Sequence, residues 1–118
     1  MDESELVAPE FVESMLERQR WFWLLLLKKG PHRDQDHATV ERLQLAHLRH
    51  LATLQQRGLL TLFGPIEGAG DLRGIGVLLV DTREAAEALL APDPMVVAGL
   101  LRAEVRPWST QPGAALPE

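Results

Sequence analysis

The fold of this chain is constrained most by one amphipathic stretch, residues 40–58, which reads V-E-R-L-Q-L-A-H-L-R-H-L-A-T-L-Q-Q-R-G. At about 100° per residue, as in an α-helix, its apolar side chains fall on one face. His47 lies in the middle of that face, four residues after Leu43 and four before Leu51. Val40 and Leu54 extend the face in the two directions. The stretch therefore predicts a helix that directs one imidazole ring at the element it packs against.

The residues on either side of this stretch suit the two ends of a helix. Asp36 can cap the first turn, because its carboxylate accepts a backbone N–H that lacks a partner within the helix. Gly58 suits the position just after the last turn, where the backbone often takes a positive φ. His50 lies at the border of the apolar face, and we interpret it as a partly exposed helix residue. His32 and His37, in or beside the preceding polar loop, are interpreted as solvated.

Composition limits the classes of function that this chain can have. Its 118 residues fit one domain. The 12 Lys and Arg against 17 Asp and Glu give a net charge of -5, with no basic stripe to neutralise phosphates, so no nucleic-acid partner is expected. Cysteine is absent, which excludes disulfides, thiolate chemistry and cysteine metal sites, and fits a reducing compartment.

Neither a membrane segment nor a cofactor motif is recognisable. The apolar run at residues 21–27 is far shorter than the roughly 20 residues that cross a bilayer, and the acidic N-terminus is unlike a secretory signal. We therefore expect a cytoplasmic protein without a membrane partner. Gly68, Gly70 and Gly74 predict a flexible hairpin connection between two strands. They precede a strand rather than a helix, so they do not form a phosphate-binding loop. No cofactor and no metal are predicted, although the spacing of His47 and His50 would permit a metal site with an added acid.

Four further segments predict the strands of a sheet, at residues 21–27, 59–63, 76–80 and 103–108. The first is continuously apolar, which favours a central strand covered on both faces. The last contains Pro107, which cannot donate to a sheet ladder, so this strand is expected at an edge.

Three shorter helices complete the predicted elements. One begins at Asp81 or Thr82 with an alanine-rich packing face, and a short helical turn follows the Pro92-Asp93-Pro94 break. The third runs from Pro9 to Arg20 and is predicted to lie on the domain as an N-terminal extension.

The order of these elements predicts an α+β fold of the ferredoxin-like βαββαβ type. Strand–helix–strand, used twice, gives a four-stranded antiparallel sheet with both main helices on one face. Residues 1–20 form the extension, 21–109 the domain and 110–118 a C-terminal tail. The second face of the sheet is left apolar and bare, which is unusual for a soluble monomer. We therefore predict a homodimer in which two such faces meet.

Two blocks of the chain resemble the YCII-related, or YciI-like, family. Residues 46–65, A-H-L-R-H-L-A-T-L-Q-Q-R-G-L-L-T-L-F-G-P, are similar to its signature of an inward histidine, a helix-ending glycine and a strand closing on Gly-Pro. Residues 82–101, T-R-E-A-A-E-A-L-L-A-P-D-P-M-V-V-A-G-L-L, resemble its alanine-rich helix running into Asp-Pro and a turn ending in Ala-Gly. Arg106-Pro107-Trp108 is similar to its closing strand, so the resemblance extends over residues 21–109.

This resemblance implies a dimeric α/β barrel with a histidine–aspartate dyad in a cleft. The dyad corresponds to His47 and Asp93, and Gly64 and Pro65 correspond to residues at the mouth of the cleft. Most members have no assigned activity; one branch resembles dehydrochlorinases of chlorinated aromatics, and the wider superfamily includes muconolactone isomerases and monooxygenases. The family pattern usually starts at the first strand, so the N-terminal extension of this chain is a departure from it.

Two classes of function follow from these residues. The first is a small enzyme for proton transfer or elimination on a small organic molecule, with His47 as general base or acid and Asp93 fixing its tautomer. The second is a non-catalytic dimeric module that binds a small-molecule ligand or a partner protein in the same cleft. Simpler roles stay open for both residues. A histidine on an apolar helix face is often a core residue, and Asp93 followed by Pro94 suits a helix cap.

Overall fold

In the computed structural model of the chain, residues 1–113 and 116–118 are described. The elements follow in the order 3-10 helix η1 (Glu3–Glu5), α1 (Pro9–Glu17), β1 (Arg20–Lys29), α2 (His37–Gln56), β2 (Leu60–Pro65), β3 (Leu72–Leu78), α3 (Arg83–Leu90), α4 (Pro94–Val97) and β4 (Leu101–Thr110).

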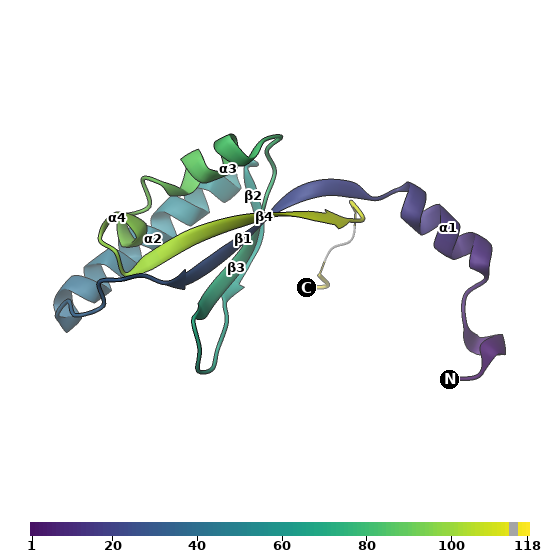
Figure 1. The fold of residues 1–118 in the computed structure, drawn as a ribbon, viewed down its shortest axis with the longest axis horizontal. Helices are drawn as coiled ribbons and strands as arrows, with labels where there is room; N and C mark the ends of the chain where they lie inside the picture. Colours follow the sequence, from purple (N-terminus) through teal and green to yellow (C-terminus); the bar gives the residue numbers. More distant parts are fainter. Residues whose placement is uncertain (114–115) are drawn as a thin grey trace.

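The four strands form one antiparallel sheet in the order β2-β3-β1-β4, with α2, α3 and α4 packed on one face (Figure 1). This arrangement confirms the predicted βαββαβ fold. β1 is central and β4 is an edge strand, as the apolar run at residues 21–27 and Pro107 respectively predicted. We call the face under the helices the helix face and the other the open face.

The core lies between the helix face and α2. Leu25 and Leu27 of β1 are buried there, together with Leu51 and Leu54 of α2. The helix boundaries follow the predicted caps: Asp36 accepts a hydrogen bond of 2.7 Å from the Thr39 N–H. That contact lowers the pKa of Asp36. The apolar pattern of residues 40–58 thus positions α2 and determines which of its side chains face the sheet.

β3 begins and ends earlier than the predicted strand at residues 76–80. Gly74 and Gly76 lie inside it, where they face Leu27 and Leu25 of β1. A Cβ atom on Gly76 would lie 3.1 Å from both Leu60 Cδ1 and Phe63 Cβ. Both glycines therefore leave room for neighbouring atoms. Gly76 was predicted to begin this strand, whereas Gly74 was predicted to belong to a flexible hairpin connection, and that expectation is wrong for Gly74. β4 also differs from its predicted bounds, because it extends to Thr110, the first residue of the predicted C-terminal tail. Within that tail, residues 114–115 lie outside the described part of the chain.

The open face is apolar, and no element of the described chain packs over β1 there as α2 does on the helix face. Leu24 and Leu26 point to it, because side chains alternate along a strand. Val77 and Ile75 of β3 are their partners across the sheet. The expectation that β1 is covered on both faces is therefore wrong for a single chain: helices cover only one.

A charged cluster ends this apolar surface at the β4 edge. Lys28 Nζ lies 2.6 Å from Glu104 Oε2, and Arg106 Nε donates to Glu104 Oε1 over 2.8 Å. The hydrogen bonds from Lys28 and Arg106 lower the pKa of Glu104 to about 2. Glu104 therefore stays charged at neutral pH and gives the open face a polar rim.

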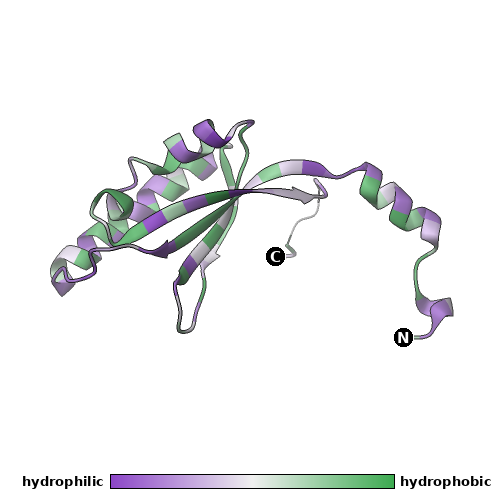
Figure 2. Cartoon of the chain, in the orientation of Figure 1, coloured by the Kyte–Doolittle hydropathy of each residue, from purple (hydrophilic) through white to green (hydrophobic). Residues whose placement is uncertain are grey.

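The N-terminal segment projects away from the sheet instead of lying on it as predicted (Figure 1). Residues 3–5 form a capped 3-10 turn, and α1 follows with Pro9 in its first turn. Apolar and polar residues alternate along α1 (Figure 2), and Phe11 and Leu16 are more than half exposed. No helix in residues 1–113 or 116–118 has the length and apolar character of a membrane span.

Gly30, which follows β1, offers a test of the close backbone contact between this position and Gly99 and Leu100. Its N–H donates to the Leu100 carbonyl over 2.9 Å, and an added Cβ would lie 2.1 Å from the Gly99 carbonyl oxygen. Because both sides of this contact are backbone, Gly30→Ala is expected to lower the free energy of unfolding by about 3 kcal/mol, at the upper end of overpacking costs. Urea unfolding of the wild type and the variant measures this decrease in the free energy of unfolding. Gly64→Ala is the control, since a Cβ there meets no atom within 4 Å and stability should stay near wild type.

Candidate active site

His47 and Asp93 meet in the interior, although 46 residues separate them in the sequence. His47 Nδ1 lies 2.6 Å from Asp93 Oδ2, and the two residues are 6% and 0% exposed. α2 supplies the histidine from the middle of its inner face, and the aspartate is the N-cap residue immediately before α4. The structure therefore brings together the two residues that the family resemblance proposed as a dyad.

Asp93 is held by its own helix cap. Its Oδ1 accepts the Met95 N–H over 2.9 Å and the Val96 N–H over 3.4 Å, while Oδ2 faces His47. Pro94 occupies the first position of α4. A backbone N–H at that position would have no partner within the helix, so the lack of one in proline costs no hydrogen bond. The capping role and the partnership with histidine thus coexist, one on each oxygen.

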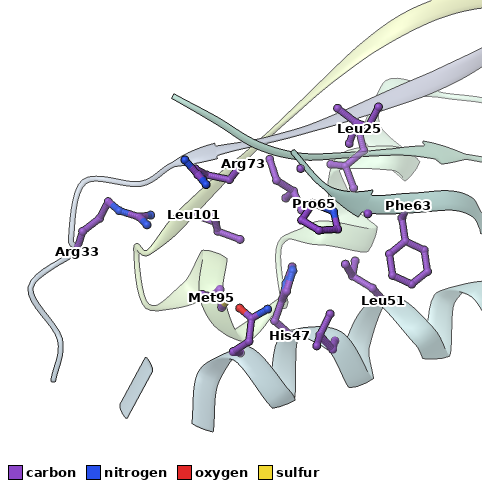
Figure 3. Close-up of a pocket in the computed structure, with 15 residues that line it drawn as sticks. Leu25, Arg33, His47, Leu51, Phe63, Pro65, Arg73, Met95 and Leu101 are labelled. Atoms are coloured by element: carbon purple, nitrogen blue, oxygen red, sulfur yellow. The ribbon is translucent and has the colours of Figure 1, made fainter. Parts of the chain in front are cut away.

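This geometry selects one tautomer of the His47 ring. An ionised carboxylate only accepts hydrogen bonds, so Nδ1 must carry the hydrogen that joins it to Asp93. In the neutral ring Nε2 then holds a free lone pair. His47 projects from α2 into a cleft (Figure 3), so this lone pair is suited to accept a proton from a molecule bound there.

The cleft has a volume of about 510 Å³, within the range of small-molecule sites. It lies between α2, β1 and the β2–β3 hairpin. Its lining comprises Leu25, Leu27, Arg33, Gln44, His47, Leu48, Leu51, Phe63, Gly64, Pro65, Arg73, Gly74, Ile75, Met95 and Leu101. The predicted Gly64 and Pro65 are among them. Most of the walls are apolar, which suits a small molecule with an apolar body and few polar groups.

The other histidines have structural partners outside the cleft. His50 Nε2 donates to the Leu89 carbonyl over 2.7 Å and so ties α2 to α3. His37 pairs with Glu41 over 3.1 Å at the exposed start of α2. The His32 ring packs against Gly99, and its backbone N–H donates to the carbonyl of that residue. Within residues 1–113 and 116–118, no three His, Asp or Glu side chains are grouped as metal ligands.

Sequence reasoning did not assign Arg33 or Arg73 to the site. Arg33 comes from the loop between β1 and α2, and Arg73 from the start of β3. Neither segment has a periodic apolar pattern from which the direction of a side chain could be predicted. Only the folded chain brings these two arginines to the cleft that contains His47.

Two solved structures resemble the chain. The 5-chloro-2-hydroxyhydroquinone dehydrochlorinase of Burkholderia phenoliruptrix AC1100, in complex with 2,5-dihydroxybenzoquinone, has a TM-score of 0.53 and 24% identity, with 72% of this chain and 92% of that chain covered. Muconolactone isomerase has a TM-score of 0.60 and 18% identity, with 82% and 97% covered. At these identities the likeness shows the fold alone, and that fold agrees with the antiparallel sheet described above.

No curated protein matches the chain. The family model of the YCII-related domain, however, matches residues 22–109, from near the start of β1 to near the end of β4. The match thus includes α2 with His47, α4 with its cap Asp93 and nearly all of the sheet, and it leaves out the projecting α1. The chain belongs to the YCII-related family.

Proposed function

We propose that the chain is a small enzyme that catalyses proton transfer or elimination on a small organic molecule, with His47 as the base. One observation carries this proposal: the buried hydrogen bond of 2.6 Å between His47 Nδ1 and Asp93, made by a ring that lines the cleft. A ring needed only for packing does not require a buried carboxylate partner. Within the cleft, histidine is the group best suited to exchange protons near neutral pH.

In this proposal Nε2 of His47 takes a proton from a carbon or oxygen of the bound molecule, and Asp93 stabilises the imidazolium that forms. In an elimination, the electrons of the broken C–H bond form a double bond and the leaving group departs with its bonding pair. In an isomerisation, the imidazolium returns the proton to a different carbon. Gly64 and Pro65, which line the cleft, would border the path of the substrate.

We also propose that two copies associate through their open faces. Leu24 and Leu26 of β1 and Ile75 of β3 lie on that surface, and Ile75 is 38% exposed in the single chain. An apolar sheet face of this kind is typical of a protein interface. A two-fold dimer would cover the face of each copy with that of the other.

Solvent deuterium exchange tests the proposed chemistry without knowledge of the product. Small cyclic keto acids, lactones and hydroxyquinones are incubated with the protein in heavy water and followed by NMR. For at least one of them, the wild-type protein is expected to replace a carbon-bound hydrogen by deuterium or to form a product, because the base removes that hydrogen. His47→Gln should lose this activity while keeping its far-UV circular dichroism.

His37→Gln is the matched control, since His37 is an exposed histidine on the same helix and lies outside the cleft lining. This variant should retain the wild-type rate. Retention of the rate by His47→Gln would contradict the proposal. A compound that raises the thermal stability of wild type and His47→Gln equally, with no exchange in either, would favour the ligand-binding module instead.

A further inference from the structure

The lining of the cleft carries cationic side chains and no acidic ones, although the chain as a whole has a net charge of -5. Its lining includes Arg33, Arg73 and His47 and contains no Asp or Glu. The nearby carboxylate of Asp93 is fully buried behind His47 and holds both that ring and the start of α4. A molecule that enters this cleft therefore meets two guanidinium groups and no carboxylate.

Neither arginine is neutralised within the described residues. The ion pairs found in residues 1–113 and 116–118 use other basic groups, namely Lys28, His37, His47, Arg102 and Arg106. Arg33 donates one N–H to the Leu100 carbonyl, and Arg73 donates one to the Gly68 carbonyl over 3.2 Å. A guanidinium has five N–H donors, so each retains donors for a ligand.

The two arginines come from separate elements but approach the same end of the cleft. Arg33 belongs to the loop after β1 and Arg73 to β3, whereas His47 lies across from them on α2 (Figure 3). Two guanidinium groups that line one cleft repel each other, and the attraction of both to an anion placed between them offsets that repulsion. Carboxylate and phenolate oxygens fit guanidinium donors particularly well, because the hydrogen bonds are charge-assisted.

We propose that the cleft selects a small organic anion, whose charged oxygen lies between Arg33 and Arg73 and whose apolar ring lies against Leu51 and Phe63. Carboxylates and ionised hydroxyls share this chemistry. The arginines bind and orient the anion, and His47 faces the ring. The role of His47 rests on the proposed function, but selective binding of an anion does not depend on it.

Benzoate and benzamide test this selection, because they differ little in shape and the amide lacks the charge. Calorimetry with the full chain is expected to show benzoate binding at least about tenfold tighter than benzamide, the usual scale of a hydrogen bond to a charged group. Arg33→Gln and Arg73→Gln should each remove about tenfold of the benzoate affinity and leave that of benzamide unchanged. Glutamine keeps an N–H donor for the carbonyl that each arginine now binds, so the local fold has a substitute contact.

Arg57→Gln is the control, because Arg57 is an exposed arginine at the end of α2 and does not line the cleft. It should bind benzoate as the wild type does. Equal affinity for the two probes, no benzoate binding, or wild-type benzoate affinity in both cleft variants would each overturn the inference. Selective benzoate binding in a protein that exchanges no substrate deuterium would instead retain the anion site and remove the proposed enzyme.

Discussion

Asp93→Asn is expected to abolish nearly all proton transfer while the fold remains. The asparagine oxygen can still accept the Met95 N–H, so the cap of α4 survives. Its amide nitrogen, however, would then face His47 Nδ1 and donate to it. The ring hydrogen must move to Nε2, which leaves no lone pair on the side of the cleft. The base is thus lost through the wrong tautomer rather than through unfolding.

The expected loss is large. In a Ser-His-Asp triad the same carboxylate-to-amide change lowers kcat by about 10⁴-fold, and we expect a decrease in the exchange rate of that order. The rate of deuterium incorporation measures this effect. ¹⁵N NMR of the imidazole reports which ring nitrogen carries the hydrogen: Nδ1 in the wild type and Nε2 in Asp93→Asn. A purely structural role for Asp93 would not change the tautomer and the rate together.

Asp36→Asn is the matched control. Asp36 also caps a helix, through its hydrogen bond of 2.7 Å from the Thr39 N–H, but it has no histidine partner in the described structure. The same chemical change there should leave both the exchange rate and the tautomer of His47 as in the wild type. Wild-type turnover in Asp93→Asn, with hydrogen still on Nδ1, would disprove the assigned role of the carboxylate.

Each half of the His47–Asp93 pair could be predicted from local pattern, but their contact could not. His47 stands out because it interrupts an apolar helix face, and Asp93 because Asp-Pro suits the start of a helix. Neither pattern indicates the other residue, since 46 positions separate them. The pairing was predicted only from the family resemblance. In the structure, the packing of α4 beside α2 brings the two side chains into contact.

The arginines of the cleft illustrate the opposite case. Arg33 lies in an irregular loop and Arg73 next to Gly74 at the start of a strand, so no periodicity predicts where their side chains point.

A similar lack of local signal explains why the predicted strand at residues 76–80 begins later than β3, which runs from Leu72 to Leu78. Glycine usually weakens a strand, yet Gly74 lies inside β3, where a Cβ would come within 3.1 Å of the Gly64 carbonyl oxygen of β2. Tertiary packing overrides local propensity at such positions.

Leu26→Lys is expected to convert the proposed dimer into folded monomers. Leu26 lies on the open face, between Ile75 of β3 and Glu104 of β4. In a single chain the new ammonium group reaches water and can pair with Glu104 across the strands, so the monomer should stay folded. In a two-fold dimer the substitution places two charges in an apolar interface, and each costs several kcal/mol to remove from water. Sedimentation equilibrium should therefore report the mass of one chain.

Leu45→Lys separates this effect from a general effect of added charge. Leu45 is a leucine of α2 that is already 62% exposed, on the far side of the sheet from the open face, so the same substitution should leave the dimer mass unchanged. A wild-type chain that sediments as a monomer, or a Leu26→Lys variant that still sediments as a dimer, would contradict the proposal that the open face is the interface.

The same variant tests whether one chain forms the whole anion site. The cleft lies on the helix face, so monomeric Leu26→Lys should keep its selectivity for benzoate if a single chain forms that site. Loss of that selectivity would mean that the second copy is needed to complete the site.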